Sequence, residues 1–128
     1  MKPRAAGLIR QARRSGRIVV GVALTRTAVR SGRVAAVLVA EDLRPDRRDS
    51  LIERWGAAGF PIFRGWSKDE LGEIAGKPAV SVLAVTDRNI AAGLVHLAGE
   101  SSTGEVTVRE GGDRRVRLSP EQEEVDRA

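Results

Sequence analysis

The sequence predicts an α/β fold, a three-layer α/β/α sandwich in which helices cover both faces of a central sheet. Strand-like and helix-like segments alternate along residues 1–97 in the order α-β-α-β-α-β-α-β-α, as expected when a sheet lies between helices. Seven consecutive apolar residues, from Val34 to Ala40, are followed directly by Glu41 and Asp42, which is typical of a strand buried on both faces. At 128 residues, the chain can form one domain with a substantial core.

The first predicted helix lies between Pro3, which suits a first turn, and Gly16, which suits a helix end. Apolar residues share one helical face and arginines share another. The two sets are Ala5, Leu8, Ile9, Ala12 and Arg10, Arg13, Arg14, Arg17. Nine basic residues and no acidic one precede Glu41. Because these arginines have no acidic partner in the helix, we expect them to form an outward basic surface.

A short strand, Ile18–Val20, leads through Gly21 into a second helix at Val22–Ser31. We expect Leu24 and Ala28 to face inward. A glycine at this turn permits a tight backbone, and it also lets an anion approach the unpaired N–H groups of the helix start. The sequence therefore predicts that a ligand binds near Gly21.

Three further arginines extend the basic surface along this helix: Arg26, Arg30 and Arg33. We expect the arginines to gather on the side where the second helix begins. Residues 1–97 carry 17 Lys and Arg against 9 Asp and Glu, whereas residues 98–128 carry 5 against 8. A basic body of this kind favours a polyanionic partner such as nucleic acid.

The next helix is predicted to open at Pro45, with Asp42 capping its first N–H groups. Its inward face is Leu51, Ile52, Trp55 and Ala58. A short strand, Pro61–Phe63, follows it.

A capping box at Ser67 to Glu70 begins a fourth helix that runs to Ala75. Residues Ala79–Val85 form another buried strand. Asp87 then caps the last helix of the body. Its inward face is Ile90, Ala91, Leu94 and Leu97.

Beyond Leu97 the composition shifts to Gly, Ser and charged residues. We therefore predict a domain at 1–97 and a polar tail at 98–128. The tail is expected to be mostly disordered, with a weak hairpin as the alternative. That hairpin would pair 105–109 with 115–118 across Gly111 and Gly112.

Several functional classes are excluded by composition. There is no Cys and only one histidine, His96, so we expect no metal site and no cofactor. No apolar run could cross a bilayer, and no signal peptide precedes Gly21. We therefore expect a cytoplasmic protein that does not bind membranes.

No catalytic set is evident, and we expect that the protein is not an enzyme. Residues Gly72–Lys77 lack the glycine spacing and the Ser or Thr of a phosphate loop. Neither Ser31 nor Ser81 has a plausible histidine partner. Glu41 and Asp42 are better explained by strand-end charge and helix capping than as an acid–base pair.

Several segments together resemble a known family. They are Gly21 and Gly32 with ten residues between them, VAAVLVAEDLRP at 34–45, GFPI at 59–62 and SKDELGEIAGKP at 67–78. This combination resembles the kink-turn RNA-binding superfamily of large-subunit ribosomal proteins, the L-seven-Ae or Gadd-like fold. The bacterial YlxQ-like branch is nearest in length. The resemblance, which covers about 5–97, implies a four-stranded mixed sheet within the three-layer sandwich.

Family members bind RNA through the start of the second helix and two flanking loops. The family motif is a glycine, a small residue, Asn and Glu, with a Lys three residues after the Glu. Gly21 and Val22 match it, whereas Ala23, Leu24 and Thr27 replace the Asn, Glu and Lys. Because Ala and Leu side chains cannot hydrogen-bond a base edge, we predict RNA binding with weak kink-turn selectivity, or binding to a different RNA shape.

The flanking loops match the family better. Lys68 falls at a family contact, and Lys77 and Val80 fall in the other RNA-facing loop. Arg26 is a hypothetical replacement donor to guanine. The predicted RNA-binding set is Arg17, Gly21, Val22, Ala23, Leu24, Arg26, Thr27, Arg30, Lys68, Lys77 and Val80.

The sequence therefore predicts a monomeric, ribosomal-type protein that binds structured RNA. One alternative is a protein-interaction module, in which Val22 and Leu24 contact an apolar patch on a partner. Another is the RNA-recognition domain of a separate modifying enzyme.

Overall fold

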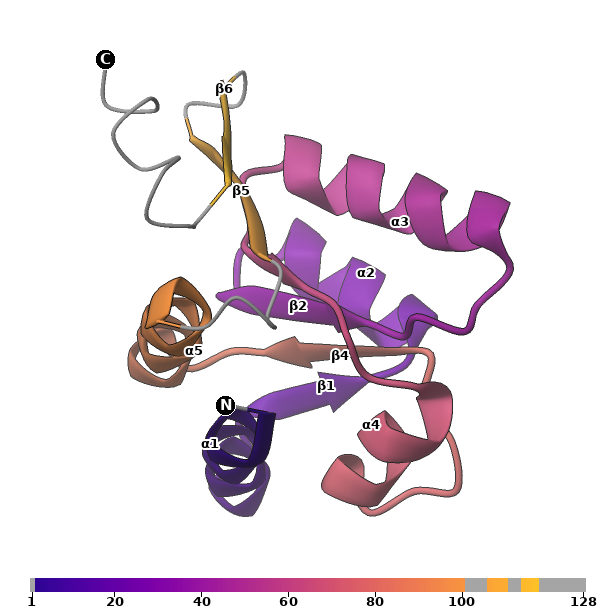
Figure 1. Cartoon of the computed structure of the whole chain (residues 1–128), viewed down its shortest axis with the longest axis vertical. Helices are drawn as coiled ribbons and strands as arrows, with labels where there is room; N and C mark the ends of the chain where they lie inside the picture. The colour runs from indigo at the N-terminus through magenta and orange to yellow at the C-terminus, as the bar shows by residue number, and fades with distance from the viewer. Residues whose placement is uncertain (1, 101–105, 111–113, 118–128) are drawn as a thin grey trace.

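A mixed sheet lies between two layers of helices in the computed structural model, which describes residues 2–100, 106–110 and 114–117 (Figure 1). The four strands of the body are β1 (Ile18–Val20), β2 (Ala36–Val39), β3 (Ile62–Phe63) and β4 (Val82–Val85), in the order β1-β4-β2-β3. The central strand β2 is parallel to β3 and antiparallel to β4, and β4 is antiparallel to β1. The predicted α/β sandwich with a four-stranded mixed sheet is confirmed.

Helices α1 (Lys2–Arg14), α4 (Lys68–Ala75) and α5 (Arg88–Glu100) pack against one face of the sheet. Helices α2 (Val22–Arg30) and α3 (Pro45–Ala57) pack against the other. Side chains of the central strands alternate between two separate cores, because successive residues of a strand point to opposite faces. Leu38 and Leu83 belong to the first core, and Val37 and Ala84 to the second.

A hairpin extends the sheet beyond β3. Strands β5 (Val106–Glu110) and β6 (Arg114–Arg117) pair with each other, and β5 pairs antiparallel with β3. The strands correspond to the two segments that the sequence offered as a weak hairpin. As the alternative to disorder, the sequence predicted a hairpin separate from the sheet. It joins the sheet because β3 would otherwise be an edge strand with unpaired N–H and C=O groups, which β5 satisfies. Residues 98–100 of the predicted tail are the last residues of the helix Arg88–Glu100. The other tail residues lie outside the described residues, and the domain boundary stays a prediction.

The cap predicted for α3 belongs to another helix. Asp42 Oδ1 accepts a 2.9 Å hydrogen bond from the backbone N–H of Lys68, at the start of α4. Helix α3 begins instead after Arg44, without a side-chain cap, and Pro45 at its first position has no N–H to satisfy. The other two predicted caps are confirmed, since Ser67 forms the full capping box and Asp87 accepts from two N–H groups of α5.

The prediction that Leu24 faces inward is wrong. Leu24 is 61% exposed, while Thr25 and Ala28 are completely buried. Val22 and Val29 are partly buried against the same core. The inward stripe of α2 therefore runs along the spacing of three and four residues that joins these positions, and it leaves Leu24 on the outer side.

Candidate nucleic-acid interface

The strand directions bring four connections to one edge of the sheet, here called the Gly21 edge. Val20, the last residue of β1, pairs with Leu83 near the start of β4, and Val39, the last residue of β2, pairs with Val82. Strand β3 is parallel to β2. The connections that follow β1, β2 and β3 and the one that precedes β4 therefore lie together.

Backbone hydrogen bonds join these connections. Gly21 N–H donates to the carbonyl of Val82 at 2.9 Å, and Val80 N–H donates to the carbonyl of Lys68 at 3.0 Å. Asp42, in the connection after β2, accepts a hydrogen bond from the Lys68 N–H. The start of α2, the start of α4 and the loop before β4 are thus fixed relative to one another.

The N-terminus of α2 is open at this edge. Gly21 is its N-cap residue, with φ 100° and ψ 155°, and it provides no side-chain acceptor. The first turn of α2 contains no acidic residue. The N–H groups of the first turn have no partner within the helix, and the helix dipole makes this end positive. The geometry is suited to an anionic group.

The side chains around this helix start are mostly apolar. Leu24 and Ala23 are exposed and Val22 is partly buried. Thr27 is exposed, and its hydroxyl donates to the carbonyl of Ala23 at 3.3 Å. Direct readout of base edges needs donors or acceptors, and Val22, Ala23 and Leu24 offer only their backbone N–H groups.

Two lysines flank the helix start. Lys77 is exposed and Lys68 is partly buried. Val80, the third predicted loop residue, is only 3% exposed and packs in the core. Its side chain therefore supports the loop from beneath, and only its backbone can take part in contacts there.

Gly72 positions the loop that carries Lys77, a role that the sequence reading missed. A Cβ at Gly72 would lie 2.6 Å from the carbonyl oxygen of Lys77 and 2.9 Å from Cα of Ala79. Lys77 N–H also donates to the Gly72 carbonyl at 2.8 Å. The loop thus lies directly on the backbone of α4. Gly72 is visible in the SKDELGEIAGKP segment of the sequence, but only the packing shows why a glycine is required there.

The expectation that arginines gather where α2 begins is wrong. Arg17 precedes β1 and Arg30 ends α2, so both lie toward the opposite edge of the sheet. Arg26 lines a groove between α2 and α3 together with Arg47 and Arg54. The proposed role of Arg26 as a guanine donor stays a prediction.

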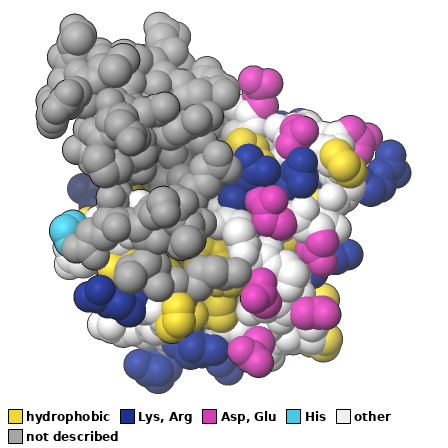
Figure 2. Space-filling model, in the orientation of Figure 1, with side chains coloured by type: hydrophobic (Ala, Val, Ile, Leu, Met, Phe, Trp, Pro, Cys, Tyr) yellow, Lys and Arg dark blue, Asp and Glu magenta, His cyan; other side chains and the backbone are white. Residues whose placement is uncertain are grey.

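The arginine row of α1 also faces another helix. Arg10 forms an ion pair with Glu73 of α4 at 3.5 Å, and the guanidinium of Arg13 lies against Gly76. Figure 2 shows acidic and basic side chains interspersed over the right-hand part of the view instead of one continuous basic face. Tertiary packing thus gives Arg10 an acidic partner that the helix itself lacks.

The two acidic residues after β2 are both held by structural contacts. Glu41 accepts from Arg64 Nε at 2.8 Å and lies 3.9 Å from Arg48 Nη1. Asp42 is the cap described above. Within the described part of the chain, no group of three or more His, Cys, Asp or Glu residues is arranged to hold a metal ion. None of the helices described there is long and apolar enough to span a membrane.

Comparison with known proteins identifies the family of this chain. The model of the Ribosomal protein L7Ae/L30e/S12e/Gadd45 family matches residues 4–95. The large ribosomal subunit protein eL30 of Sulfurisphaera tokodaii is 33% identical over 76 residues, which cover 58% of this chain and 72% of that protein. The eL30 protein of Sulfolobus acidocaldarius is 35% identical over 77 residues, with 58% and 73% covered.

A solved structure has the same fold. It is that of a protein of unknown function from Bacillus halodurans, with a TM-score of 0.67 and 24% identity over 73% of this chain and 94% of that one. The family match includes all four strands of the body and all the connections at the Gly21 edge. The chain belongs to the L7Ae/L30e/S12e/Gadd45 family of ribosomal proteins.

Proposed function

We propose that this protein binds structured RNA of the kink-turn type, with reduced selectivity for base sequence. The observation that carries the proposal is the uncapped start of α2 at Gly21, held beside Lys68 and Lys77. Phosphate oxygens suit both the free N–H groups and the lysine side chains. Membership of a ribosomal protein family makes RNA the favoured anion.

Reduced selectivity follows from the side chains at the start of α2. Ala23 and Leu24 are exposed where the resemblance expects Asn and Glu, but they have no polar side-chain atoms. Contacts to phosphate position a protein on RNA, whereas contacts to base edges specify the sequence. We therefore expect the protein to prefer a kink-turn RNA over a straight duplex only weakly.

Restoring the two polar side chains should restore selectivity. The double variant Ala23→Asn/Leu24→Glu should raise the preference for a kink-turn RNA over a straight duplex by roughly 5- to 150-fold, the equivalent of about 1–3 kcal/mol for a good base contact. Both positions are exposed, so the fold should tolerate the change, and an acidic residue in a first turn is favourable. Fluorescence anisotropy with labelled RNAs measures the ratio.

The matched control is Ala57→Asn/Gln11→Glu, which introduces the same two side chains, and the same negative charge, at exposed positions of α3 and α1. It should leave the ratio unchanged. An equal rise in both double variants, or no rise in either, would contradict the proposed orientation of α2 on the RNA.

A protein partner is the second candidate, and the exposed Leu24 beside Ala23 favours it. Affinity for RNA falls steeply with salt because counterions are released, whereas an apolar contact keeps its strength. Binding that holds from about 50 to 200 mM salt and is lost in Leu24→Ser would favour the protein partner. We also propose that the protein is cytoplasmic and a monomer. Sedimentation of the purified chain tests the monomeric state.

A further inference from the structure

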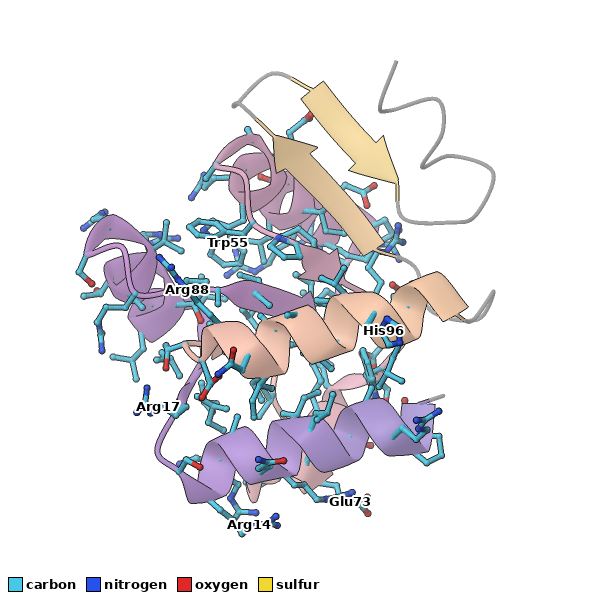
Figure 3. The ribbon with its side chains drawn as sticks, turned by 90° about the vertical axis from the view of Figure 1, so that its left-hand side faces the viewer. Arg14, Arg17, Trp55, Glu73, Arg88 and His96 are labelled. Carbon is cyan, nitrogen blue, oxygen red and sulfur yellow. The ribbon has the colours of Figure 1, made fainter. Side chains whose placement is uncertain are left out.

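A hollow of about 720 Å³ lies at the edge of the sheet opposite Gly21, here called the Arg17 edge. Three arginines from separate parts of the chain line it: Arg17, Arg33 and Arg88. They come from the residue before β1, the connection from α2 to β2, and the start of α5. Figure 3 shows Arg17 and Arg88 on the same side of the molecule.

The sheet itself brings these three residues together. The carbonyl of Arg17 accepts from Thr86 N–H at 2.9 Å, which fixes Arg17 beside the residues that precede Arg88. Arg33 N–H donates to the carbonyl of Ala28 at 3.1 Å, which ties it to the last turn of α2. The arrangement is therefore set by backbone pairing and does not depend on the arginine side chains.

The three arginines of the hollow carry a positive charge that no described acidic side chain pairs with. In the parts of the chain that the structure describes, no ion pair involves Arg17, Arg33 or Arg88. Arg33 Nε donates to the hydroxyl of Ser31 at 3.2 Å, which orients the guanidinium without removing its charge. Three like charges that share one hollow repel each other, so an anion that binds there relieves the repulsion.

The N-terminus of α5, next to the hollow, contributes little to anion binding. Asp87 Oδ1 already accepts from Asn89 N–H at 2.8 Å and from Ile90 N–H at 3.0 Å. Its carboxylate lies next to Arg88 in the chain and opposes an anion at that point. Any anion is therefore held by the guanidiniums, whose planar donors match phosphate oxygens in a bidentate geometry.

Apart from Thr86, the remaining lining is mostly small and apolar. It includes Ala35, Pro61, Ala91 and Val95. A ribose can lie against such a surface while its phosphates contact the arginines, which suits a nucleic-acid strand better than an isolated phosphate ion.

We propose that Arg17, Arg33 and Arg88 bind the phosphate backbone of an RNA strand, so that RNA contacts this protein at two opposite edges of its sheet. The inference rests on the proposed function only in taking RNA as the ligand. The edges are separated by the length of the central strands, about 13 Å for four residues. That distance exceeds the screening length of about 10 Å at 0.1 M salt, so charge changes at one edge should act independently of the other.

The test measures the affinity of the full chain for a kink-turn RNA that carries a single-stranded uridine extension, by anisotropy at several salt concentrations. The variant Arg17→Ala/Arg88→Ala should reduce the magnitude of the slope of log K against log salt by about 1.4 to 1.8, because each lost phosphate contact removes about 0.7 to 0.9. Both side chains are exposed, so the fold should persist. If circular dichroism shows otherwise, Arg33→Ala/Arg88→Ala replaces it.

The matched control is Arg14→Ala/Arg54→Ala, which removes two exposed arginines outside the hollow. Figure 3 shows Arg14 on the side of α1 away from Arg88. The control should leave the slope within about 0.3 of the unaltered chain, because charges that touch no phosphate are largely screened. Equal slopes in the two double variants would overturn the inference.

A third variant, Lys68→Ala/Lys77→Ala, separates this inference from the proposed function. Loss of affinity in the lysine variant alone leaves the Gly21 edge as the binding surface and rejects the hollow. Loss in the Arg17→Ala/Arg88→Ala variant alone keeps the hollow and rejects the Gly21 edge. Loss in both supports two contacts, and no measurable RNA binding by the unaltered chain rejects both proposals.

Discussion

Gly21 has a backbone conformation that other residues rarely adopt. With φ 100° and ψ 155°, it lies in a region that is essentially restricted to glycine and costs other residues about 1–3 kcal/mol. A Cβ built at Gly21 would meet no heavy atom within 4 Å. The penalty for a side chain there is therefore conformational and not steric.

We predict that Gly21→Ala lowers the free energy of unfolding by about 1–3 kcal/mol, measured by urea denaturation. Gly7→Ala is the matched control, since Gly7 also has open space around it but lies inside α1 without a positive φ. That change should raise stability by about 0.5–1 kcal/mol because alanine favours a helix interior. Equal effects of the two variants would show that Gly21 is free to relax.

Gly72 illustrates the opposite situation, because here space and not conformation requires glycine. The loop at Lys77 and Ala79 leaves no room for a Cβ, and the obstructing atoms belong to the backbone, which cannot move as a side chain can.

We predict that Gly72→Ala destabilises the protein by about 1–3 kcal/mol, the usual cost of overpacking, despite the gain of about 1 kcal/mol in helix propensity. It should also shift the amide NMR signals of the loop before β4 and weaken RNA binding. Gly56→Ala in α3 is the control, because nothing lies within 4 Å of its Cβ position. Unchanged loop signals in Gly72→Ala would refute the assignment of Gly72 as the support of this loop.

Local signals in the sequence predicted most of the elements, and non-local contacts account for the errors. The capping box at Ser67 was readable because its partners are three residues apart. Asp42 was assigned to the nearest helix, but its partner Lys68 is 26 residues away. The periodicity of α2 was equally ambiguous, because Leu24 and Thr25 could each be paired with Ala28 at helical spacing and only packing on the sheet decides between them.

The same reasoning explains how far the site could be predicted. Glycine at the strand-to-helix turn and lysine in the flanking loops follow from the motif itself. The distribution of arginines does not, because helix α2 starts at one edge of the sheet and ends at the other. Arg17 and Arg30 therefore lie far from Gly21, although they are near it in the sequence.

At the scale of the whole molecule, helices and strands of the α/β body supply the described residues of both cores. Among residues whose side chains the structure describes, those buried in the two cores lie between Ala5 and Ala98. Within the described residues, the hairpin pairs with β3 at two positions, Ile62 with Thr107 and Phe63 with Val106, and β5 also lies beside α3. Its contribution to stability should therefore be that of a few hydrogen bonds at an edge strand.

We predict that a chain ending at Glu100 folds cooperatively and loses only about 1–2 kcal/mol of stability, since each edge hydrogen bond contributes about 0.5–1.5 kcal/mol. A single urea transition with native helical circular dichroism would support this, with the full chain as the reference. The cut lies after Ala98 because that residue is buried in the first core. A broad, non-cooperative transition would mean that β5 and β6 are an integral part of the domain, and the boundary near Leu97 would then be wrong.

The removed residues 101–128 carry 5 basic and 7 acidic side chains. Their removal should therefore leave RNA affinity equal or higher, because a repulsive charge is lost. A clear fall in affinity would instead assign the hairpin to the RNA-binding surface.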